Sequence, residues 1–200
     1  MQLYLASNNK KKAQELQRVL DAAGIAGVEI LLTADVAPYA EPIEDGRTFQ
    51  DNALIKARAG AAATGLPSLA DDSGLAVDEL NGMPGVLSAR WSGGHGDDDA
   101  NNELLLGQMA HVPDGRRSCG FVSVCALVLP DGTEHVARGE WRGTLLRERR
   151  GEGGFGYDPL FLPEDAEGRA SAELSPAEKD ARSHRGKALA QLVPVISRLS

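Results

Sequence analysis

The chain begins with a short apolar run that leads at once into a polar turn and a helical pattern. The apolar run covers residues 3–6, the turn is Ser7-Asn8-Asn9, and Lys10-Lys11-Lys12 begins the helix. A strand that turns directly into a helix leaves backbone N–H groups unpaired at the helix start, and these groups attract anions. Polar turn side chains and lysine charges add to that attraction. We expect a phosphate or carboxylate site here; the alternative is a capped surface helix with solvated lysines.

The chain as a whole is acidic, although its first turn is basic. Its 200 residues carry a formal charge of −8. A local basic site on an acidic chain indicates a small anionic ligand. Charge alone predicts no nucleic-acid partner, because neutralising a phosphate backbone needs a basic face. The length suits one domain, with or without two lobes, so we expect a single domain over residues 1–200.

The apolar segments predict neither a membrane partner nor a secretory signal. The run at residues 3–6 is too short for a signal and its positive charges follow it, and no segment approaches the roughly 18 apolar residues of a membrane span. On one strand, Cys119 and Cys125 would stand about 20 Å apart, too far for a disulfide. They indicate core packing in a reducing compartment, so we expect a cytoplasmic protein.

The hydrophobic pattern predicts strands and helices that alternate early, followed by a late hairpin. Strands are expected at residues 3–6, 28–32, 66–70, 121–129 and 134–146. Helices are expected at residues 10–23, 48–65, 97–109 and 185–199, with a short one starting at Ser175-Pro176. Residues 33–47 form a long connection and 82–96 an irregular, glycine-rich one. This order favours an α/β fold with a mixed sheet.

Two acidic segments are candidates for metal binding. Asp71-Asp72-Ser73-Gly74 follows the strand expected to end at residue 70, where a carboxylate can bind Mg²⁺ or activate water. Neighbouring strand residues face opposite sides, so only one aspartate should face a given cleft. Glu44-Asp45-Gly46 could bring a second carboxylate beside Asp72. The alternatives are an aspartate-rich turn and a solvated acidic loop.

Two later segments are candidates for binding a nucleobase. Residues 153–159, Gly-Gly-Phe-Gly-Tyr-Asp-Pro, combine glycines that allow close backbone approach with aromatic rings that offer a face for a base. Ser183-His184-Arg185, with Lys179 upstream, supplies donors for a carbonyl oxygen or a phosphate. The alternatives are a plain loop and a basic helix entry.

Taken together, these segments resemble the inosine triphosphate pyrophosphatase family, which clears ITP, dITP and XTP. The resemblance runs through nearly the whole chain. Its blocks are Ser7-x-Asn9-x-x-Lys12-x-x-Glu15, Glu44-x-Gly46-x-Thr48-Phe49-x-x-Asn52-Ala53, Lys56-Ala57, Ala70-Asp71-Asp72-Ser73-Gly74-Leu75, Pro84-Gly85-Val86, Ser88-Ala89-Arg90, residues 153–159 and Ser183-His184-Arg185-Gly186. It departs from the family pattern at Trp91, where a tyrosine is expected, and at the Gly- and Asp-rich residues 93–99.

The resemblance implies a fold, a reaction and a set of site residues. The fold is an elongated mixed β-sheet flanked by helices, with two lobes and a substrate cleft between them. The reaction is hydrolysis of a purine nucleoside triphosphate to the monophosphate and pyrophosphate by a Mg²⁺-dependent homodimer. Glu44 and Asp72 match the metal positions, and Asp72 is also the proton acceptor. The matching substrate positions are Ser7, Asn8, Asn9, Lys10, Lys11, Lys12, Ser73, Phe155, Gly156, Tyr157, Asp158, Lys179, His184 and Arg185, with weaker roles for Lys10 and Lys11.

These roles lead to a hypothesis for base selection. Phe155 and Tyr157 flank the purine, while His184 and Arg185 donate to its 6-oxo group. Adenine carries a donor amine at that position, so the donors would be left unpaired. Three alternatives stay open: a nucleotide pyrophosphatase that prefers another base such as a modified pyrimidine, a nucleotide-binding sensor without turnover, and a glycosidase with two carboxylates.

Overall fold

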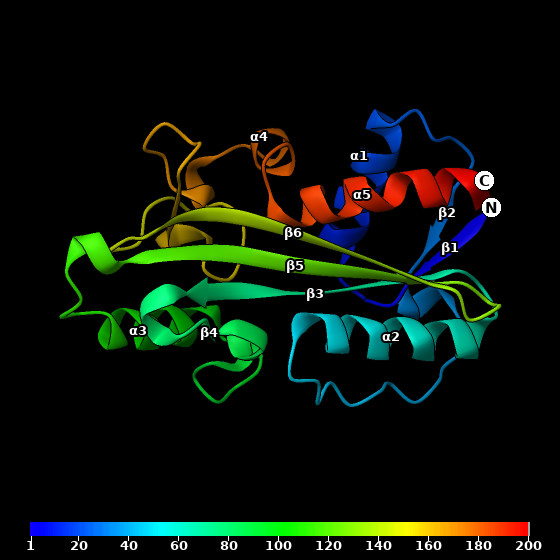
Figure 1. Ribbon diagram of the computed structural model, residues 1–200, viewed down its shortest axis with the longest axis horizontal. Coiled ribbons are helices and arrows are strands. Elements are labelled where there is room, and N and C mark those ends of the chain that lie inside the picture. The colour runs from blue at the N-terminus through cyan, green and yellow to red at the C-terminus, as the bar shows by residue number, and fades with distance from the viewer. Residues whose placement is uncertain (200) are drawn as a thin grey trace. The chain divides into compact units, whose positions relative to one another are not determined.

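The computed structural model describes residues 1–199, which form two compact units (Figure 1). Unit 1 consists of Met1–Asp72, Ser123–Gly139 and the segment from Arg185 on, and unit 2 of Ser73–Val122 and Glu140–His184. Within the described residues the strands form one mixed sheet in the order β2-β1-β3-β5-β6-β7, with β4 paired to β3. The α/β class with a mixed sheet is therefore confirmed, and the two units agree with the two expected lobes. The cleft stays a prediction.

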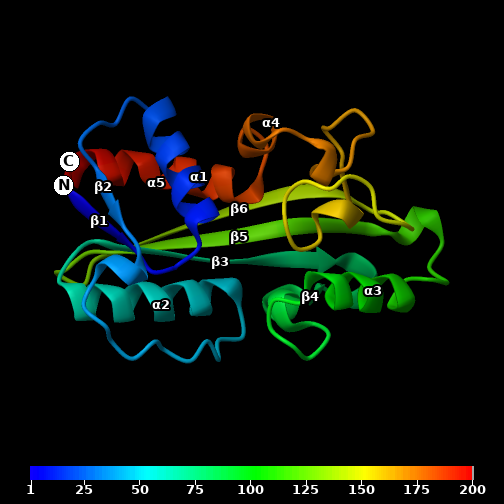
Figure 2. The same ribbon diagram turned by 180° about the vertical axis from the view of Figure 1, so that it is seen from behind.

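Unit 1 starts with parallel strands. Its elements are β1 (Gln2–Leu5), α1 (Lys10–Ala22), β2 (Glu29–Leu31), α2 (Phe49–Thr64) and α5 (His184–Leu199) from Arg185 on, with parts of β3 (Ser68–Val77), β5 (Ser118–Val128) and β6 (Glu134–Leu145). Strand β1 pairs in parallel with β2, Leu3 opposite Ile30, and with β3, Tyr4 opposite Ser68. Helices α1 and α5 cover one face of these strands and α2 covers the other (Figure 2).

Alternating strand residues build the two layers of unit 1. Leu69 on β3 packs with Leu16 of α1 and Leu189 of α5. The next residue, Ala70, packs with small α2 side chains such as Ala57. Because successive side chains point to opposite faces and both faces are covered here, the neighbouring residues Leu69 and Ala70 are both apolar.

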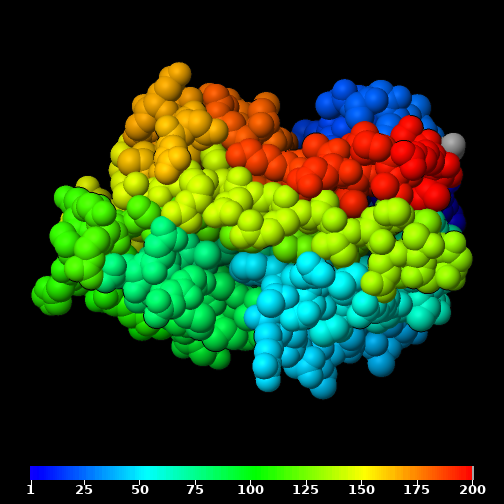
Figure 3. Space-filling view, viewed as in Figure 1, coloured from blue at the N-terminus to red at the C-terminus, as the bar shows by residue number. Residues whose placement is uncertain are grey.

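The hairpin of β5 and β6 is held from both sides in unit 1. Arg58 on α2 forms an ion pair with Glu134 at 2.6 Å, and Gln191 on α5 donates to the carbonyl of Arg138 at 2.9 Å. In the space-filling view, the yellow-green hairpin accordingly lies between the cyan α2 and the red α5 (Figure 3).

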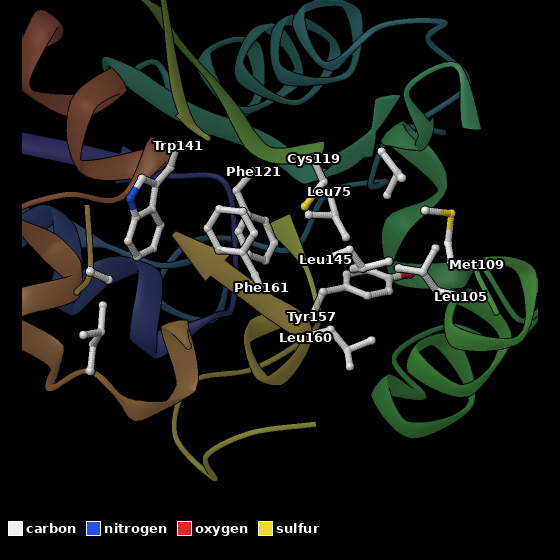
Figure 4. Packing of buried hydrophobic residues seen from close by; sticks show 13 residues of the cluster. Leu75, Leu105, Met109, Cys119, Phe121, Trp141, Leu145, Tyr157, Leu160 and Phe161 are labelled. Atoms are coloured by element: carbon white, nitrogen blue, oxygen red, sulfur yellow. The ribbon is translucent and has the colours of Figure 1, made fainter. Parts of the chain in front are cut away.

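Unit 2 has a core of its own, built largely around aromatic rings. Its elements are β4 (Met83–Pro84), a 3₁₀ segment (Gly85–Arg90), α3 (Asp98–Gln108), β7 (Phe161–Pro163) and α4 (Pro176–Asp180), with the remaining parts of β3, β5 and β6. The ring of Phe161 packs edge-to-face with Phe121 and with Trp141, at centroid distances of 4.8 and 5.3 Å (Figure 4). Strands β4 and β7 pair antiparallel with β3 and β6.

Most predicted elements are found within a few residues of their expected bounds, and one difference bears on the site. Strand β3 was expected to end at Ala70, but it continues to Val77, so Asp71 and Asp72 lie within a strand and the alternative of an aspartate-rich turn is wrong. The strand continues because Leu75 and Val77 are fully buried in the core of unit 2. Strands β4 and β7, of two and three residues, were not predicted.

Two expectations from composition can be compared directly with the structure. Cys119 and Cys125 both lie on β5 as buried free thiols, and burial raises the pKa of each to about 12. Their reading as core residues is confirmed. None of the helices described over residues 1–199 has the length and apolar character needed to cross a membrane.

Candidate functional site

The first turn is organised by its own side chains. The side-chain oxygen of Asn9 caps α1, accepting from the backbone N–H groups of Lys11 at 2.9 Å and Lys12 at 3.4 Å. Ser7 Oγ accepts from the N–H of Asn9 at 3.1 Å. Two of the helix-start donors expected to bind an anion are thus already bonded, as in the capped-helix alternative. Attraction for an anion therefore depends more on the exposed side chains of Lys10 and Lys11 than on the helix start.

Asp71 forms the centre of a buried ion-pair network in unit 1. Lys12 Nζ lies 2.8 Å from its Oδ1, and Arg185 Nε lies 3.0 Å from its Oδ2. Arg185 Nη1 also bonds Glu15 Oε2 at 2.6 Å. Asp71 and Arg185 are 6% and 4% exposed, so these charges are desolvated and depend on one another.

The pKa shifts in this network follow from burial and charge together. Burial alone would raise the pKa of Asp71, but the charges of Lys12 and Arg185 outweigh it and hold that pKa well below its ordinary value. Burial alone would lower the pKa of Arg185, but Asp71 and Glu15 outweigh it and raise it. Asp71 and Arg185 are therefore both charged at neutral pH.

Asp72 points to the other face of β3, toward α2. Its Oδ2 accepts from Asn52 Nδ2 at 3.0 Å, and its Oδ1 lies 3.9 Å from Lys56 Nζ. The same ammonium lies 2.8 Å from Glu44 Oε2. The expected opposite orientation of the two aspartates is thus observed, and Glu44 and Asp72 converge on one positive charge.

The arrangement around Lys56 suits a hard divalent cation. Two carboxylates from separate segments offer only oxygen ligands, and the single charge of the Lys56 ammonium offsets only part of their negative charge. Within residues 1–199 no group of three or more His, Cys, Asp or Glu side chains is arranged to hold a metal. A site with two carboxylates fits Mg²⁺, which usually keeps several waters and shares substrate phosphates.

Burial raises the pKa of Asp72, with contributions from Glu44 and Asp71, while Lys56 and Asn52 oppose the rise.

Asn52 and Lys56 were not predicted as site residues. They lie one turn apart on the same face of α2, and Asn52 also accepts from the Gly46 N–H at 2.8 Å. A Cβ at Gly46 would lie 2.5 Å from the Asp51 Cβ and 2.6 Å from Asn52 Oδ1. The acidic loop therefore rests directly on the start of α2. The signal in the sequence was the i, i+4 spacing of these two polar residues beside the apolar positions Ala53, Leu54 and Ala57.

In unit 2, the buried carboxylate of Asp158 organises the glycine-rich loop. It accepts from the Phe155 N–H at 2.8 Å and from Ser171 Oγ at 2.8 Å, and it pairs with Lys179. Gly154 has a positive φ, and a Cβ there would lie 2.0 Å from Asp158 Oδ2. This glycine is therefore required by the turn itself, whereas the sequence suggested close approach to a ligand.

The two aromatic rings of this loop have different environments. Phe155 is 38% exposed, and Lys179 Nζ lies 5.0 Å from its ring centroid. Tyr157 is 3% exposed and packs in the core of unit 2, where its hydroxyl donates to the Ser88 carbonyl at 2.9 Å (Figure 4). Of the two, only Phe155 offers a ring face to solvent, so the structure does not support Tyr157 as a partner for a base.

The remaining predicted residues fall into the same two groups. In unit 1, Asn8 is exposed at the first turn. In unit 2, Ser73 directly follows Asp72 on β3, Gly156 belongs to the loop of Phe155, and the buried His184 ring stacks on Phe121 at 4.9 Å. The metal and substrate roles of the whole set stay predictions.

Comparisons with known proteins bear on the chain as a whole. Residues 3–195 match the model of the Ham1 family. A dITP/XTP pyrophosphatase of Corynebacterium glutamicum is 66% identical over all of this chain and 98% of the relative. A crystal structure titled as the nucleoside-triphosphatase / dITP/XTP pyrophosphatase of Mycobacterium abscessus is 57% identical, with a TM-score of 0.81 over 98% of this chain and 100% of that one. The Staphylococcus aureus Ham1 protein is 32% identical, with a TM-score of 0.88 over the full length of both chains. The expected resemblance is confirmed, and the chain belongs to the Ham1 family.

Proposed function

We propose that this chain hydrolyses the non-standard purine nucleoside triphosphates ITP, dITP and XTP to the monophosphate and pyrophosphate. Relatives named dITP/XTP pyrophosphatase share 57–66% of its residues over nearly their full length. The observation in the structure that carries the proposal is the convergence of Glu44 and Asp72 on the Lys56 ammonium. Phosphate binding alone gains nothing from two carboxylates, so their convergence favours metal-assisted hydrolysis over a sensor.

Glu44 and Asp72 would hold Mg²⁺ in this proposal. Bound there, the ion would neutralise charge on the triphosphate and lower the pKa of a bound water. Asp72 would orient the attacking water and accept its proton. Lys10, Lys11 and Lys12 would pair with the phosphates.

Base selection would depend on one exposed ring and on donors. Phe155 offers a face for stacking, and His184 and Arg185 are the proposed donors to the 6-oxo group. Arg185 Nε and Nη1 already bond Asp71 and Glu15, so any contact with the base must use another donor of its guanidinium. A donor left facing the adenine amine costs roughly 1–3 kcal/mol, about 5- to 150-fold in kcat/KM.

We further propose that both units act as one catalytic domain, that the enzyme is a homodimer, and that it works in the cytoplasm. The two buried thiols, which form no disulfide, fit a reducing compartment such as the cytoplasm.

A parallel assay tests the proposal. ITP, dITP, XTP, GTP, ATP and a modified pyrimidine triphosphate are incubated with the enzyme, with and without Mg²⁺, while monophosphate, pyrophosphate and inorganic phosphate are quantified. We expect Mg²⁺-dependent release of pyrophosphate, with kcat/KM for ITP and XTP at least about tenfold above that for ATP. Release of inorganic phosphate, a preference for the pyrimidine, or binding without turnover would each contradict it.

A further inference from the structure

We infer that Asp98 and Asn102 on α3 are positioning residues that hold the backbone of Gly156 and thereby set the direction of the Phe155 ring. The Gly156 N–H donates to Asp98 Oδ2 at 2.6 Å. The Gly156 carbonyl accepts from Asn102 Nδ2 at 2.9 Å. Asp98 and Asn102 stand four residues apart, on one face of the helix. One residue of the loop is thus held at both of its backbone polar groups.

The orientation of the Asn102 amide is fixed by its surroundings. Its nitrogen also donates to the Asp98 carbonyl at 2.7 Å, so it lies between two acceptors. The side chain is 2% exposed, and its oxygen is buried without a hydrogen-bond partner in the described part of the chain. An unpaired buried oxygen is unfavourable, so an amide is a poor choice for packing alone. The bond to the Gly156 carbonyl gives this amide a use.

These bonds fix the backbone on both sides of Phe155. The Gly156 N–H belongs to the peptide that follows Phe155, and Asp98 holds it. The Phe155 N–H belongs to the peptide that precedes it, and Asp158 holds that one at 2.8 Å. Gly156 itself has a left-handed φ of 62°, which glycine adopts without strain. The two bonded peptides restrict the φ and ψ of Phe155, which lies between them. The Cα–Cβ bond of the half-exposed Phe155 therefore projects from the loop in a set direction.

The inference rests on the proposed function, in which Phe155 stacks on the purine. It also gives a role to the Asp-rich residues 97–99, which depart from the family pattern. Asp97 caps α3, Asp98 holds Gly156, and Asp99 pairs with Arg149 at the surface. Among these described bonds, that of the middle aspartate is the one that reaches the loop, so the three can be told apart by substitution.

The test compares Asp98→Ala and Asn102→Ala with two matched controls. Asp99→Ala removes the adjacent carboxylate. Asn101→Ala removes an equally buried amide, which accepts from the Ser92 N–H at 2.7 Å and leaves Gly156 untouched. We expect Asp98→Ala and Asn102→Ala to raise KM for ITP by about tenfold with kcat within about twofold, and the controls to keep KM within about twofold.

A double-substitution cycle separates positioning from general stability. In a Phe155→Ala background, Asn102→Ala should raise KM no further, because its effect passes through the ring. An additive effect, or an equal rise in KM for Asn101→Ala, would overturn the inference. Should Asn102→Ala fail to fold, the exposed Asp98 carries the same cycle.

A measurement without substrate keeps this inference separate from the proposed function. Amide hydrogen exchange in the nucleotide-free protein should find the Gly156 N–H protected in the wild type and in Asp99→Ala, and exchanging faster in Asp98→Ala. A freely exchanging Gly156 amide in the wild type would refute the inference even if ITP is hydrolysed. A wild type that does not hydrolyse ITP would instead refute the function.

Discussion

Asp71 and Asp72 are neighbours with opposite chemistry. The pKa of Asp71 is lowered because, although burial opposes ionisation, Lys12 and Arg185 outweigh it. The pKa of Asp72 is raised because burial outweighs the help of Lys56 and Asn52. Strand geometry separates the two, since one faces α1 and α5 while the other faces α2. Ionised Asp71 therefore stabilises the fold, whereas ionised Asp72 opposes folding and is available for chemistry.

The same substitution at the two positions should therefore have opposite effects. Asp71→Asn leaves the buried Arg185 undercompensated, so we expect a loss of roughly 3–5 kcal/mol in the free energy of unfolding. Asp72→Asn removes a charge that opposes folding, so the metal-free variant should be as stable as the wild type or more so, bind ITP, and release no pyrophosphate. Denaturant unfolding, calorimetry and the pyrophosphate assay measure these outcomes. Near-normal turnover by Asp72→Asn would remove that residue from the base role.

The pH dependence of stability follows with opposite signs. The contribution of Asp71 is present above its ordinary pKa of 3.8 and disappears as the pH falls below it, so wild type and Asp71→Asn should converge in acid. The contribution of protonated Asp72 is present at acid pH and is lost as the pH rises through its raised pKa. The stability of Asp72→Asn relative to wild type should therefore increase with pH.

At the scale of elements, the sequence predicted local secondary structure better than the tertiary contacts that each element makes. Periodicity and capping found α1, α3 and α5 to within a residue or two because these signals are local. The extent of β3 was missed because its last residues are buried by the distant core of unit 2. The buried position of Tyr157 was missed for the same reason, since an aromatic beside glycines gives no local sign that its hydroxyl bonds the Ser88 carbonyl. Its substrate role stays a prediction.

The acidic loop shows an element positioned by a contact that only the structure reveals. Asn52 bonds both the Gly46 N–H and Asp72, so it ties the loop of Glu44 to the second carboxylate. Gly46→Ala should displace the loop from α2, because the added Cβ would lie 2.5 Å from Asp51 Cβ and 2.6 Å from Asn52 Oδ1. We expect Mg²⁺ affinity, measured by calorimetry, to fall by about tenfold or more, with a smaller change in melting temperature.

Ile43→Ala is the matched control for the loop. Ile43 lies in the same segment and is 81% exposed. Its aliphatic side chain forms no hydrogen bond with Asn52 or Lys56. The variant should bind Mg²⁺ as the wild type does. An equal loss of Mg²⁺ affinity in the two variants would show that the packing of Gly46 against α2 does not position Glu44.

At the scale of the molecule, the charge is divided unevenly between the units. Unit 1 holds eleven basic and twelve acidic side chains, whereas unit 2 holds ten and seventeen. An acidic chain can thus present a cationic turn, because most of the excess negative charge resides in the other unit. Composition predicted the contrast, but only the division into units shows where the acidic excess lies.

The two units have separate cores, yet three strands take part in both. Each of these strands has buried residues in each core: β3 with Leu69 and Leu75, β5 with Cys125 and Phe121, and β6 with Ala137 and Trp141. We therefore expect the loss of one of these strands in one unit to destabilise the core of the other unit. We expect a single unfolding transition in denaturant, with coincident midpoints by circular dichroism and tryptophan fluorescence.

The positions of the tryptophans make this expectation sharp. Trp91 and Trp141, the two tryptophans of the chain, both belong to unit 2, whereas Asp71 belongs to unit 1. Asp71→Asn should lower the fluorescence midpoint as far as the dichroism midpoint, because the continuous strands carry the loss from one core to the other. If the dichroism midpoint fell while the fluorescence midpoint stayed in place, the units would unfold independently, and the shared strands would not couple their stabilities.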